Sequence, residues 1–335
     1  MNIIIPMAGL GKRMRPHTLT TAKPLIPVAG KSVVERLVED ITKVCGEKIN
    51  EIAFIINPSF GKAVEENLLA IAKNQGAKGS IWYQEEALGT AHAIMCAEPV
   101  LNGKTVVAFA DTLFKADFKM DTTHDGVIWV QKIDDPSQFG VVKINKDNVI
   151  TDFLEKPKEF VSDLAIIGIY YFKDGAYLKS ELRYLLDNNI REKGEYQLTN
   201  ALENMKAKGT RFVPGKVSEW LDCGNKAATV NTNQRILEYD KGNPRLRGKN
   251  VHIENSVIIE PCFLGDDSRI INSVIGPHVS IGKASSVENS VIRNSIIQNN
   301  SKLISVNIAD SMIGNNAEVL GNSRDLNIGD FTTLS

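Results

Sequence analysis

The last third of this 335-residue chain repeats itself, and this repetition constrains the fold more than any other feature of the sequence. The tetrapeptide Asn-Ser-Val-Ile occurs at 255–258, 272–275 and 289–292, with a period of 17 residues, and related tetrapeptides at 294–297 and 310–313 continue the pattern. A fixed period of this kind is typical of a solenoid, in which each coil buries its apolar residues against the next coil.

Within the repeats an aliphatic residue returns every five or six positions, with glycine, asparagine or aspartate near the corners between them. One aliphatic residue per hexad predicts three short strands in each coil. The pattern resembles the hexapeptide repeat of left-handed parallel β-helices, which we expect over residues 250–335, after a polar linker at 240–249. The residues expected to fill its interior are Ile253, Ile259, Leu264, Ile270, Ile275, Ile281, Val287, Ile292, Ile297, Leu303, Ile308, Ile313 and Val319.

This region holds more apolar residues than its interior positions need. Those outside the register are Val251, Val257, Val274, Val291, Ile296 and Met312. An apolar patch on the outside of a solenoid favours an interface over a solvated surface. We therefore expect a homo-oligomer formed through the β-helix, as in relatives with such a tail, and the alternative is packing against the rest of the chain.

Residues 1–239 follow a different pattern, in which short apolar strands alternate with amphipathic helices. The predicted strands cover 2–6, 51–56, 80–84, 105–110 and 126–131, and the predicted helices cover 32–44, 61–75 and 90–98. This alternation predicts an α/β domain with a Rossmann-like, mostly parallel sheet covered on both faces. Ligands of such sheets bind beyond the carboxyl ends of the strands.

A glycine loop with cationic residues stands at such a strand end. The strand at 2–6 runs into Met-Ala-Gly-Leu-Gly-Lys-Arg at 7–13, and Lys-Pro-Leu-Ile-Pro follows at 23–27. Glycines let main-chain N–H groups approach an anion, and the cations add charge, so a polyphosphate is the expected ligand. Met14 excludes the dinucleotide fingerprint and Leu25 excludes a Walker loop, because both motifs need glycine at these positions.

The remaining pattern resembles the signature of sugar-nucleotide pyrophosphorylases, which join a sugar 1-phosphate to a nucleotide. Further elements of that family follow in the same order along residues 1–239. They are Gln-x4-Gly-Thr-Ala-His-Ala from 84, Ala-Asp-Thr from 110, Phe-Gly-Val-Val from 139, Phe-Leu-Glu-Lys-Pro from 153, Ile-Gly-Ile-Tyr from 167, Gly-Glu-Tyr-Gln-Leu-Thr-Asn from 194 and Trp-Leu-Asp-Cys-Gly-Asn from 220. Ala110 departs from the usual glycine before the aspartate.

The resemblance implies a role for particular residues. The nucleotide would be bound by Ala8, Gly9, Gly11, Gln84 and Gly89, and the sugar by Gly140, Glu155 and Gly168. Arg13, Lys23 and Lys156 would be catalytic, holding the leaving phosphates, the α-phosphate and the sugar phosphate respectively. Asp111 and Asp222 would hold Mg²⁺, a cation bound by one or two carboxylates plus substrate phosphates.

Two of these motifs also have plainer interpretations. Neighbouring residues on a strand point to opposite faces, so Glu155 and Lys156 could form an ordinary surface ion pair. His92 resembles a general base, but it lies inside a predicted helix and we expect it to be structural.

The composition of the chain excludes some classes of binding partner. Lysine plus arginine (39) nearly balance aspartate plus glutamate (40), and a nucleic-acid or anionic-membrane binder would show a strong basic excess. The apolar runs are far shorter than the ~20 residues that cross a bilayer. The four cysteines are scattered, without metal-ligand spacing, and fit a reducing compartment as buried thiols. We therefore expect a cytoplasmic protein that binds neither nucleic acid nor membrane.

The substrate pair is the least determined property. An NTP and a hexose 1-phosphate are expected, and glucose-1-phosphate thymidylyltransferases are the closest type. N-acetylglucosamine-1-phosphate uridylyltransferase and mannose-1-phosphate guanylyltransferase remain alternatives. The β-helix could also be an acyltransferase, with His252 or His278 as its histidine, although the repeats lack a long insertion. A non-catalytic regulatory homologue is disfavoured by the presence of every charged site residue.

Overall fold

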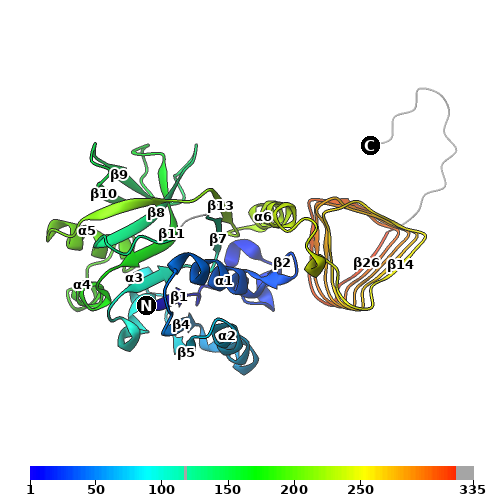
Figure 1. Ribbon diagram of the computed structural model, residues 1–335, viewed down its shortest axis with the longest axis horizontal. Helices are drawn as coiled ribbons and strands as arrows, with labels where there is room; N and C mark the ends of the chain where they lie inside the picture. Colours follow the sequence, from blue (N-terminus) through cyan, green and yellow to red (C-terminus); the bar gives the residue numbers. More distant parts are fainter. Residues whose placement is uncertain (117–118, 322–335) are drawn as a thin grey trace. The chain divides into compact units, whose positions relative to one another are not determined.

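The computed structural model describes residues 1–116 and 119–321. Packing divides the chain into two compact units (Figure 1). The first unit comprises Met1–Ile26 and Ser32–Asn225, and the second comprises Pro27–Lys31 and the chain from Lys226 onwards. The domain boundary predicted from the sequence lies later in the chain, at a linker over 240–249. The last 14 residues of the predicted β-helix, 322–335, lie outside the described residues.

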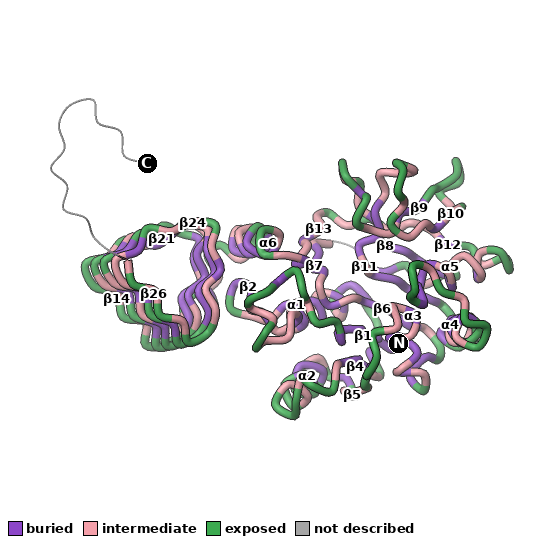
Figure 2. The backbone as a smooth tube through the Cα atoms, turned by 180° about the vertical axis from the view of Figure 1, so that it is seen from behind, coloured by how far each residue is buried: buried purple, intermediate pink, exposed green. Residues whose placement is uncertain are grey.

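The first unit is built on a mixed, nine-stranded sheet. Four parallel strands form one half in the order β6 (Thr105–Ala108), β1 (Asn2–Pro6), β4 (Glu51–Ile56) and β5 (Lys78–Tyr83). The other half contains β11 (Leu164–Phe172), which is antiparallel to β6, together with β8 (Gly126–Lys132), β9 (Gly140–Ile144), β10 (Ile150–Glu155) and β12 (Phe212–Lys216). The expected α/β class with a largely parallel core is confirmed, and β1, β4 and β6 are buried (purple in Figure 2).

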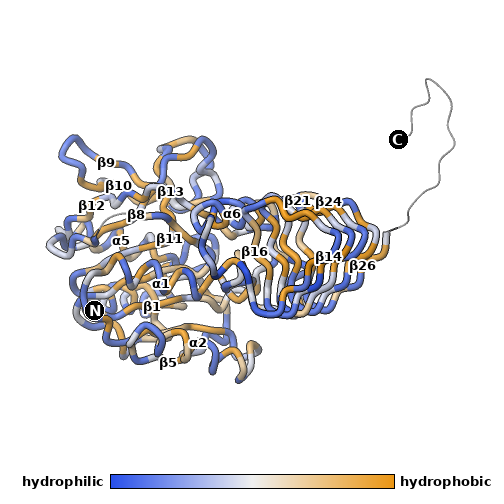
Figure 3. Tube along the Cα trace, turned by 45° about the vertical axis from the view of Figure 1, so that its right-hand side comes forward, coloured by the Kyte–Doolittle hydropathy of each residue, from blue (hydrophilic) through white to orange (hydrophobic). Residues whose placement is uncertain are grey.

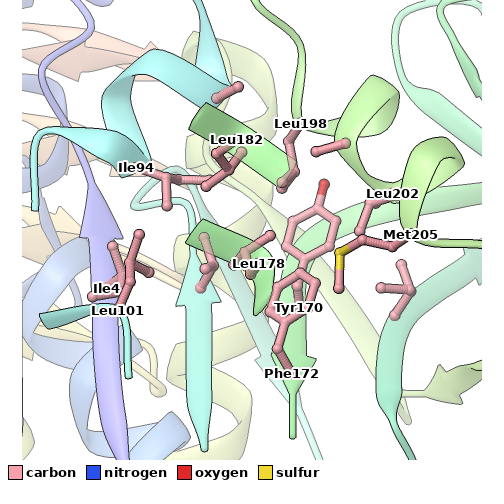
Figure 4. Close-up of a cluster of buried hydrophobic side chains, with 14 of the residues drawn as sticks. Ile4, Ile94, Leu101, Tyr170, Phe172, Leu178, Leu182, Leu198, Leu202 and Met205 are labelled. Carbon is pink, nitrogen blue, oxygen red and sulfur yellow. The ribbon is translucent and has the colours of Figure 1, made fainter. Parts of the chain in front are cut away.

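Five helices belong to this unit: α1 (Val33–Cys45), α2 (Lys62–Asn74), α3 (Thr90–Met95), α4 (Gly175–Asp187) and α5 (Leu198–Ala207). The predicted start of α1 at Ser32 is confirmed, because the Ser32 hydroxyl accepts a hydrogen bond from the Glu35 N–H at 3.2 Å. Helices α3, α4 and α5 pack their apolar residues onto the sheet, where Tyr170 and Phe172 meet Leu178, Leu198 and Met205 (Figure 4).

Strand β6 ends two residues earlier than predicted, and this difference shapes the site. The chain leaves the strand at Phe109, whose N–H donates to the Gly168 carbonyl at 2.9 Å. It then enters β7 (Thr112–Lys115), which pairs with the distant β13 (Glu219–Asp222) in a separate small sheet. Asp111, which was expected directly after a strand, therefore lies in the turn between two sheets.

The second unit contains the expected left-handed parallel β-helix. Its strands stack in three parallel sheets, and successive coils add one strand to each sheet. The first sheet stacks β14 (His252–Glu254), β17 (Arg269–Ile271), β20 (Ser286–Glu288), β23 (Lys302–Ile304) and β26 (Glu318–Leu320). The second stacks β15 (Val257–Ile258), β18 (Val274–Ile275), β21 (Val291–Arg293) and β24 (Asn307–Ala309). The third stacks β16 (Phe263–Leu264), β19 (Ser280–Ile281), β22 (Ile296–Ile297) and β25 (Met312–Ile313).

The Asn-Ser pair of the repeat makes one corner of each coil. Asn255, Asn272 and Asn289 adopt left-handed backbone conformations with φ between 46° and 49°, which asparagine tolerates better than most residues. The following serine links the coils, because Ser273 N–H donates to the Ser256 hydroxyl at 2.9 Å and the next coil repeats this bond at 3.0 Å. The repeated dipeptide thus has a structural cause.

The predicted interior is largely confirmed, with one correction and three additions. Ile258, not Ile259, stands in register with Ile275, and Ile259 is 43% exposed. Isoleucine occupies both positions, and only the strand register distinguishes the interior one. Cys262, Val279 and Val306 join the buried cluster.

The residues predicted outside the interior register divide into three groups. Val251 is partly buried and packs against the interior cluster. Val257 and Val291 are exposed and lie with Val274 in one row of the second sheet, within the orange band at β21 and β24 in Figure 3. Ile296 and Met312, on the third sheet, are buried instead.

The second unit also contains helix α6 (Lys226–Tyr239) and most of a short hairpin of β2 (Pro27–Val28) and β3 (Lys31–Ser32), whose last residue, Ser32, belongs to the first unit. Asn233 of α6 is fully buried and satisfies its amide within the unit: it accepts from Ala29 N–H at 3.0 Å and from the Ser280 hydroxyl at 2.7 Å. The predicted linker at 240–249 already packs on the first coil, since Gly248 N–H donates to the Leu264 carbonyl at 2.7 Å. Among the described helices, none combines the length and apolar character needed to cross a bilayer.

Candidate active site

A cleft of about 410 Å³ opens at the carboxyl edge of the parallel strands in the first unit. The segments that follow β1, β5 and β6 converge there, as expected for a parallel sheet. Eight of the predicted site residues line it: Ala8, Gly9, Gly11, Arg13, Lys23, Gln84, Gly89 and Asp111. Gly140, Glu155, Lys156, Gly168 and Asp222 do not line this cleft and lie on neighbouring strands and turns.

The two loop glycines differ in their surroundings. Gly11 has φ +58°, and a Cβ atom there would come within 2.9 Å of Lys23 Cβ and 3.0 Å of Thr18 Cγ2. Gly9 has no neighbour within 4 Å of such an atom. The packing of the loop therefore requires glycine at 11, whereas at 9 the missing side chain only leaves open space beside the cleft.

Lys23 and Asp111 form an ion pair inside the cleft. The Nζ atom of Lys23 lies 2.8 Å from Oδ2 of Asp111, and the lysine side chain is 11% exposed. Lys23 begins the 3₁₀ turn Lys23–Leu25, and Asp111 follows β6. Close packing against Gly11 holds Lys23 beside the glycine loop, so a cation, a carboxylate and open main-chain N–H groups face one space.

Asp222 stands next to Asp111 through the pairing of β13 with β7. The Cys223 N–H donates to the Asp111 carbonyl at 2.9 Å, and Asp222 accepts from the Gly224 N–H at 2.9 Å. Burial raises the pKa of Asp222, the Asp111 carboxylate raises it further, and the Gly224 hydrogen bond, Lys23 and Arg13 counteract the rise. A divalent cation between the two carboxylates would relieve this repulsion, so the pair suits a divalent metal site.

The donor set suits Mg²⁺ held partly by a ligand. Within residues 1–116 and 119–321, no three histidine, cysteine or acidic side chains gather closely enough to hold a metal by themselves. Mg²⁺ does not need such a cage, because it takes one or two protein carboxylates and completes its octahedron with phosphate oxygens and water.

Gln84 and Gly89 also line the cleft: Gln84 directly follows β5, and Gly89 is the N-cap residue of α3. Gln84 is 7% exposed, and its Nε2 atom donates to the Gly89 carbonyl at 3.2 Å. Gly89 has φ +113°, and a Cβ atom there would come within 2.5 Å of the Tyr196 carbonyl oxygen. Glycine at 89 is thus required by the segment Glu195–Tyr196 that packs behind it, as well as lining the cleft.

The third group of predicted residues lies at the ends of β9 and β10. Gly140 pairs with Glu155, and a Cβ atom at Gly140 would come 3.3 Å from Glu155 Oε2. Burial raises the pKa of Glu155, and Lys156 counteracts part of that rise. Lys156 Nζ lies 3.5 Å from Glu155 Oε1, although strand neighbours point apart, because Lys156 has left-handed φ of 44° and turns the chain.

Tyr170 connects this group to the carboxylates electrostatically. Burial raises the pKa of the Tyr170 phenol, and the negative charges of Glu155 and Asp111 both add to the rise. Gly168 lies two residues before it with φ +86°, against Phe109. No role was predicted for Tyr170, although it is the last residue of the quoted Ile-Gly-Ile-Tyr element.

Two further charged residues were also assigned no role. Glu195 lines the cleft, and Lys193 Nζ donates to the carbonyls of Glu155 and Lys156 at 3.0 Å each. Glu195 belongs to the motif quoted from Gly194 onwards, so for this residue a signal was present without indicating that its side chain faces the site. Lys193 directly precedes that motif, and no pattern in the sequence marked it.

The fold and this cleft define a class: an α/β protein in which a glycine loop at the carboxyl edge of a parallel sheet shares a cleft with a lysine–aspartate ion pair. The family model described as nucleotidyl transferase matches residues 2–239, and the chain belongs to that family.

Named relatives agree with this assignment. The glucose-1-phosphate thymidylyltransferase of Streptomyces antibioticus is 29% identical over an alignment 349 residues long, gaps included. The alignment covers 95% of this chain and 93% of that protein. The bifunctional protein GlmU of Methanococcus maripaludis is 29% identical over 266 residues, and the match spans 78% of this chain but only 60% of that longer relative. A solved Bacillus anthracis structure, provisionally named glucose-1-phosphate thymidylyltransferase and containing sucrose, has a TM-score of 0.58 and 26% identity over 69% of this chain and 93% of its own.

Proposed function

We propose that this protein is a sugar-1-phosphate nucleotidyltransferase, which makes an NDP-sugar and pyrophosphate from an NTP and a hexose 1-phosphate. The observation that carries the proposal is the partly buried Lys23–Asp111 pair beside the open glycine loop. A cation and a carboxylate at that place suit a triphosphate, with the lysine at the phosphates and the carboxylate at their counter-cation. Family membership supports the same reaction class.

The nucleotide half of the reaction would use the glycine loop. Main-chain N–H groups of Gly9 and Gly11, with the exposed guanidinium of Arg13, would hold the β- and γ-phosphates that leave. Lys23 would neutralise charge at the α-phosphate. Such catalysis consists mainly of positioning and charge stabilisation, because phosphoryl-type transfers need little covalent chemistry from the protein.

The sugar half would use the ends of β9 and β10. Glu155 would accept hydrogen bonds from sugar hydroxyls, Gly140 and Gly168 would let the ring approach, and Lys156 would hold the sugar phosphate. An oxygen of that phosphate attacks the α-phosphorus, a new P–O bond forms, and the bond to the β-phosphate oxygen breaks. The nucleophile is already anionic near neutral pH, so no general base is required.

Mg²⁺ would be held by Asp111 and Asp222, which the structure brings to neighbouring positions. When bound, it supplies charge neutralisation to the phosphates.

Glucose 1-phosphate and dTTP are the proposed substrates. The thymidylyltransferase of Streptomyces antibioticus matches the chain almost end to end, which supports this choice. The Gln-x4-Gly-Thr-Ala-His-Ala element instead favours N-acetylglucosamine 1-phosphate and UTP, and relatives named GlmU support that second candidate. Pyrophosphate release measured across five NTPs and four sugar 1-phosphates tests both, together with mannose 1-phosphate and GTP. Release with no pair would instead favour a non-catalytic regulatory homologue.

The proposal includes cytoplasmic location and a homo-oligomer formed through the β-helix. The exposed row of Val257, Val274 and Val291 supports the interface. An acyltransferase function of the β-helix finds less support, because His278 Nε2 lies 2.5 Å from Glu238 of α6 and His252 stands on a regular coil.

A further inference from the structure

Gln84 and His92 form a hydrogen-bonded pair beside the cleft. Gln84 directly follows β5, and His92 lies in the first turn of α3, where it is half-buried. Nε2 of Gln84 lies 3.1 Å from Nδ1 of His92. Among the described residues, Gln84 lines the cleft and His92 does not. His92 therefore acts on a ligand, if at all, through Gln84.

The geometry fixes which atom of the Gln84 amide faces which neighbour. The Gly89 carbonyl can only accept, so the amide atom 3.2 Å from it must be the nitrogen. The second hydrogen of that nitrogen then meets His92 Nδ1, which must accept it, and the ring proton resides on Nε2. Burial lowers the pKa of His92, with the Glu86 carboxylate counteracting part of the change, and this favours the neutral ring.

Both amide hydrogens of Gln84 are thus committed to Gly89 and His92. No hydrogen bond to Oε1 of Gln84 occurs among the described residues, and the side chain lines the cleft. Oε1 is therefore the atom that Gln84 offers to a ligand. A fixed acceptor pairs with the ring N–H of thymine, uracil or guanine, and it repels the bare ring nitrogen that adenine and cytosine present on the same edge.

We propose that His92 is a positioning residue for nucleobase selection: by accepting a hydrogen bond from Gln84, it keeps the Gln84 amide oxygen turned toward the base. The inference rests on the proposed nucleotidyltransferase function, because it takes the ligand of Gln84 to be a nucleoside triphosphate. It replaces the expectation that His92 is merely structural.

The test measures equilibrium binding of dTTP, UTP, CTP and ATP to the full chain by calorimetry, without sugar phosphate. His92→Leu removes the acceptor at similar volume, and we expect dTTP and UTP to bind about threefold to tenfold more weakly, the range for one neutral hydrogen bond. Their preference over CTP and ATP should fall by a similar factor. His92→Asn restores an acceptor oxygen near Nδ1 and should recover most of both losses. His124→Leu, which removes an exposed histidine, is the matched control.

A double-mutant cycle separates positioning from a general packing effect. If His92 acts through Gln84, His92→Leu should change nucleotide binding little in a Gln84→Ala background. Thermal unfolding identifies any variant that has lost its fold, and His92→Asn then carries the comparison with the parent.

The outcomes distinguish this inference from the proposed function. Unchanged affinity and base preference in His92→Leu overturn the inference alone, as does a loss in His92→Asn as large as in His92→Leu. The same holds for a full additional loss in the Gln84→Ala background. A parent chain that binds none of the four nucleotides, and no GTP in the same titration, overturns the proposed function and the inference with it. A parent that binds nucleotide but releases no pyrophosphate overturns the function only, and the binding series still decides the role of His92.

Discussion

Lys23 Nζ and Asp111 Oδ2 lie 2.8 Å apart although 88 positions separate them in the sequence. The pair joins the end of the glycine-loop segment to the turn after β6, and its lysine side chain is 11% exposed. Removing one partner leaves the other charge half-buried without its counter-ion, which costs more than an exposed ion pair would. The two residues are therefore interdependent in the unliganded protein.

Asp111→Ala and Asp222→Ala should each reduce turnover about a hundredfold or more while the protein stays folded, because each removes one of two proposed Mg²⁺ ligands. Initial rates at saturating substrates, measured over a Mg²⁺ titration, check this. Circular dichroism and thermal unfolding verify the fold. Rates within about tenfold of the parent in both variants, with Mg²⁺ still required, would contradict the paired-ligand assignment.

Lys156→Ala should chiefly raise KM for the sugar 1-phosphate, and Arg13→Ala should chiefly raise KM for the NTP. Lys156 directly follows β10 and does not line the cleft, whereas Arg13 lies in the glycine-loop segment that does. Each affected KM should rise about tenfold, because the substitution removes one charge-assisted contact to phosphate. Steady-state kinetics with each substrate varied in turn measure the split. Lys158→Ala, at a neighbouring exposed lysine, is the control. An identical substrate profile in both variants would refute the separate assignments.

Gly9→Ala and Gly11→Ala form a matched pair within one loop. A methyl group at Gly9 meets no protein atom within 4 Å, so stability should be unchanged while KM for the NTP rises. At Gly11 the backbone is left-handed and the methyl group would contact Lys23, so the melting temperature should fall, with a loss of about 1–2 kcal/mol in stability. Differential scanning fluorimetry and NTP binding measure both. Equal stability of the two variants would contradict the packing argument.

Asp40 predicts a pH dependence of stability. Burial raises the pKa of Asp40 to about 6, with Lys115 and Arg36 counteracting part of the rise. Because the folded-state pKa lies above the unfolded value, the folded state binds the proton more tightly. The ionised Asp40 carboxylate therefore destabilises the folded protein. This destabilisation is absent below the unfolded-state pKa of Asp40 and fully present above about pH 6.

Asp40→Asn should accordingly stabilise the protein by about 1–3 kcal/mol at roughly pH 8, and the gain should disappear by about pH 4. Urea unfolding at the two pH values measures it, with the exposed Glu66→Gln on α2 as control. A gain of the same size at both pH values would show that packing, rather than ionisation, is responsible.

The valine row of the second β-helix sheet predicts the oligomeric state. If Val257, Val274 and Val291 form an interface between copies, Val257→Asp and Val291→Asp should each shift the full chain toward the monomer, because a buried unpaired carboxylate is costly. Light scattering after size exclusion measures this, with Arg269→Asp, an exposed position on the first sheet, as control. A monomeric parent chain would remove the interface from the proposal.

Local patterns in the sequence determined much of this protein, because they reflect contacts between neighbours in the chain or between equivalent repeats. The coil period, the inward-facing aliphatic residues, the cap of α1 and the strand before the glycine loop all follow from such regular spacing. The one-residue error at Ile259 arose because isoleucine stands at both 258 and 259, and only the strand register shows which of the two faces the interior.

Tertiary structure alone decided the relationships that depend on distant segments. The Lys23–Asp111 pair, the approach of Asp222 to Asp111 through the β7–β13 pairing, and the burial of Asn233 against Ala29 and Ser280 each join residues tens of positions apart. The direction of the Gln84 amide likewise depends on an acceptor that only the packed start of α3 supplies. Spacing in a single chain specifies which residue types are present, but hydrogen-bond direction and charge pairing depend on three-dimensional neighbours, which only the fold brings together.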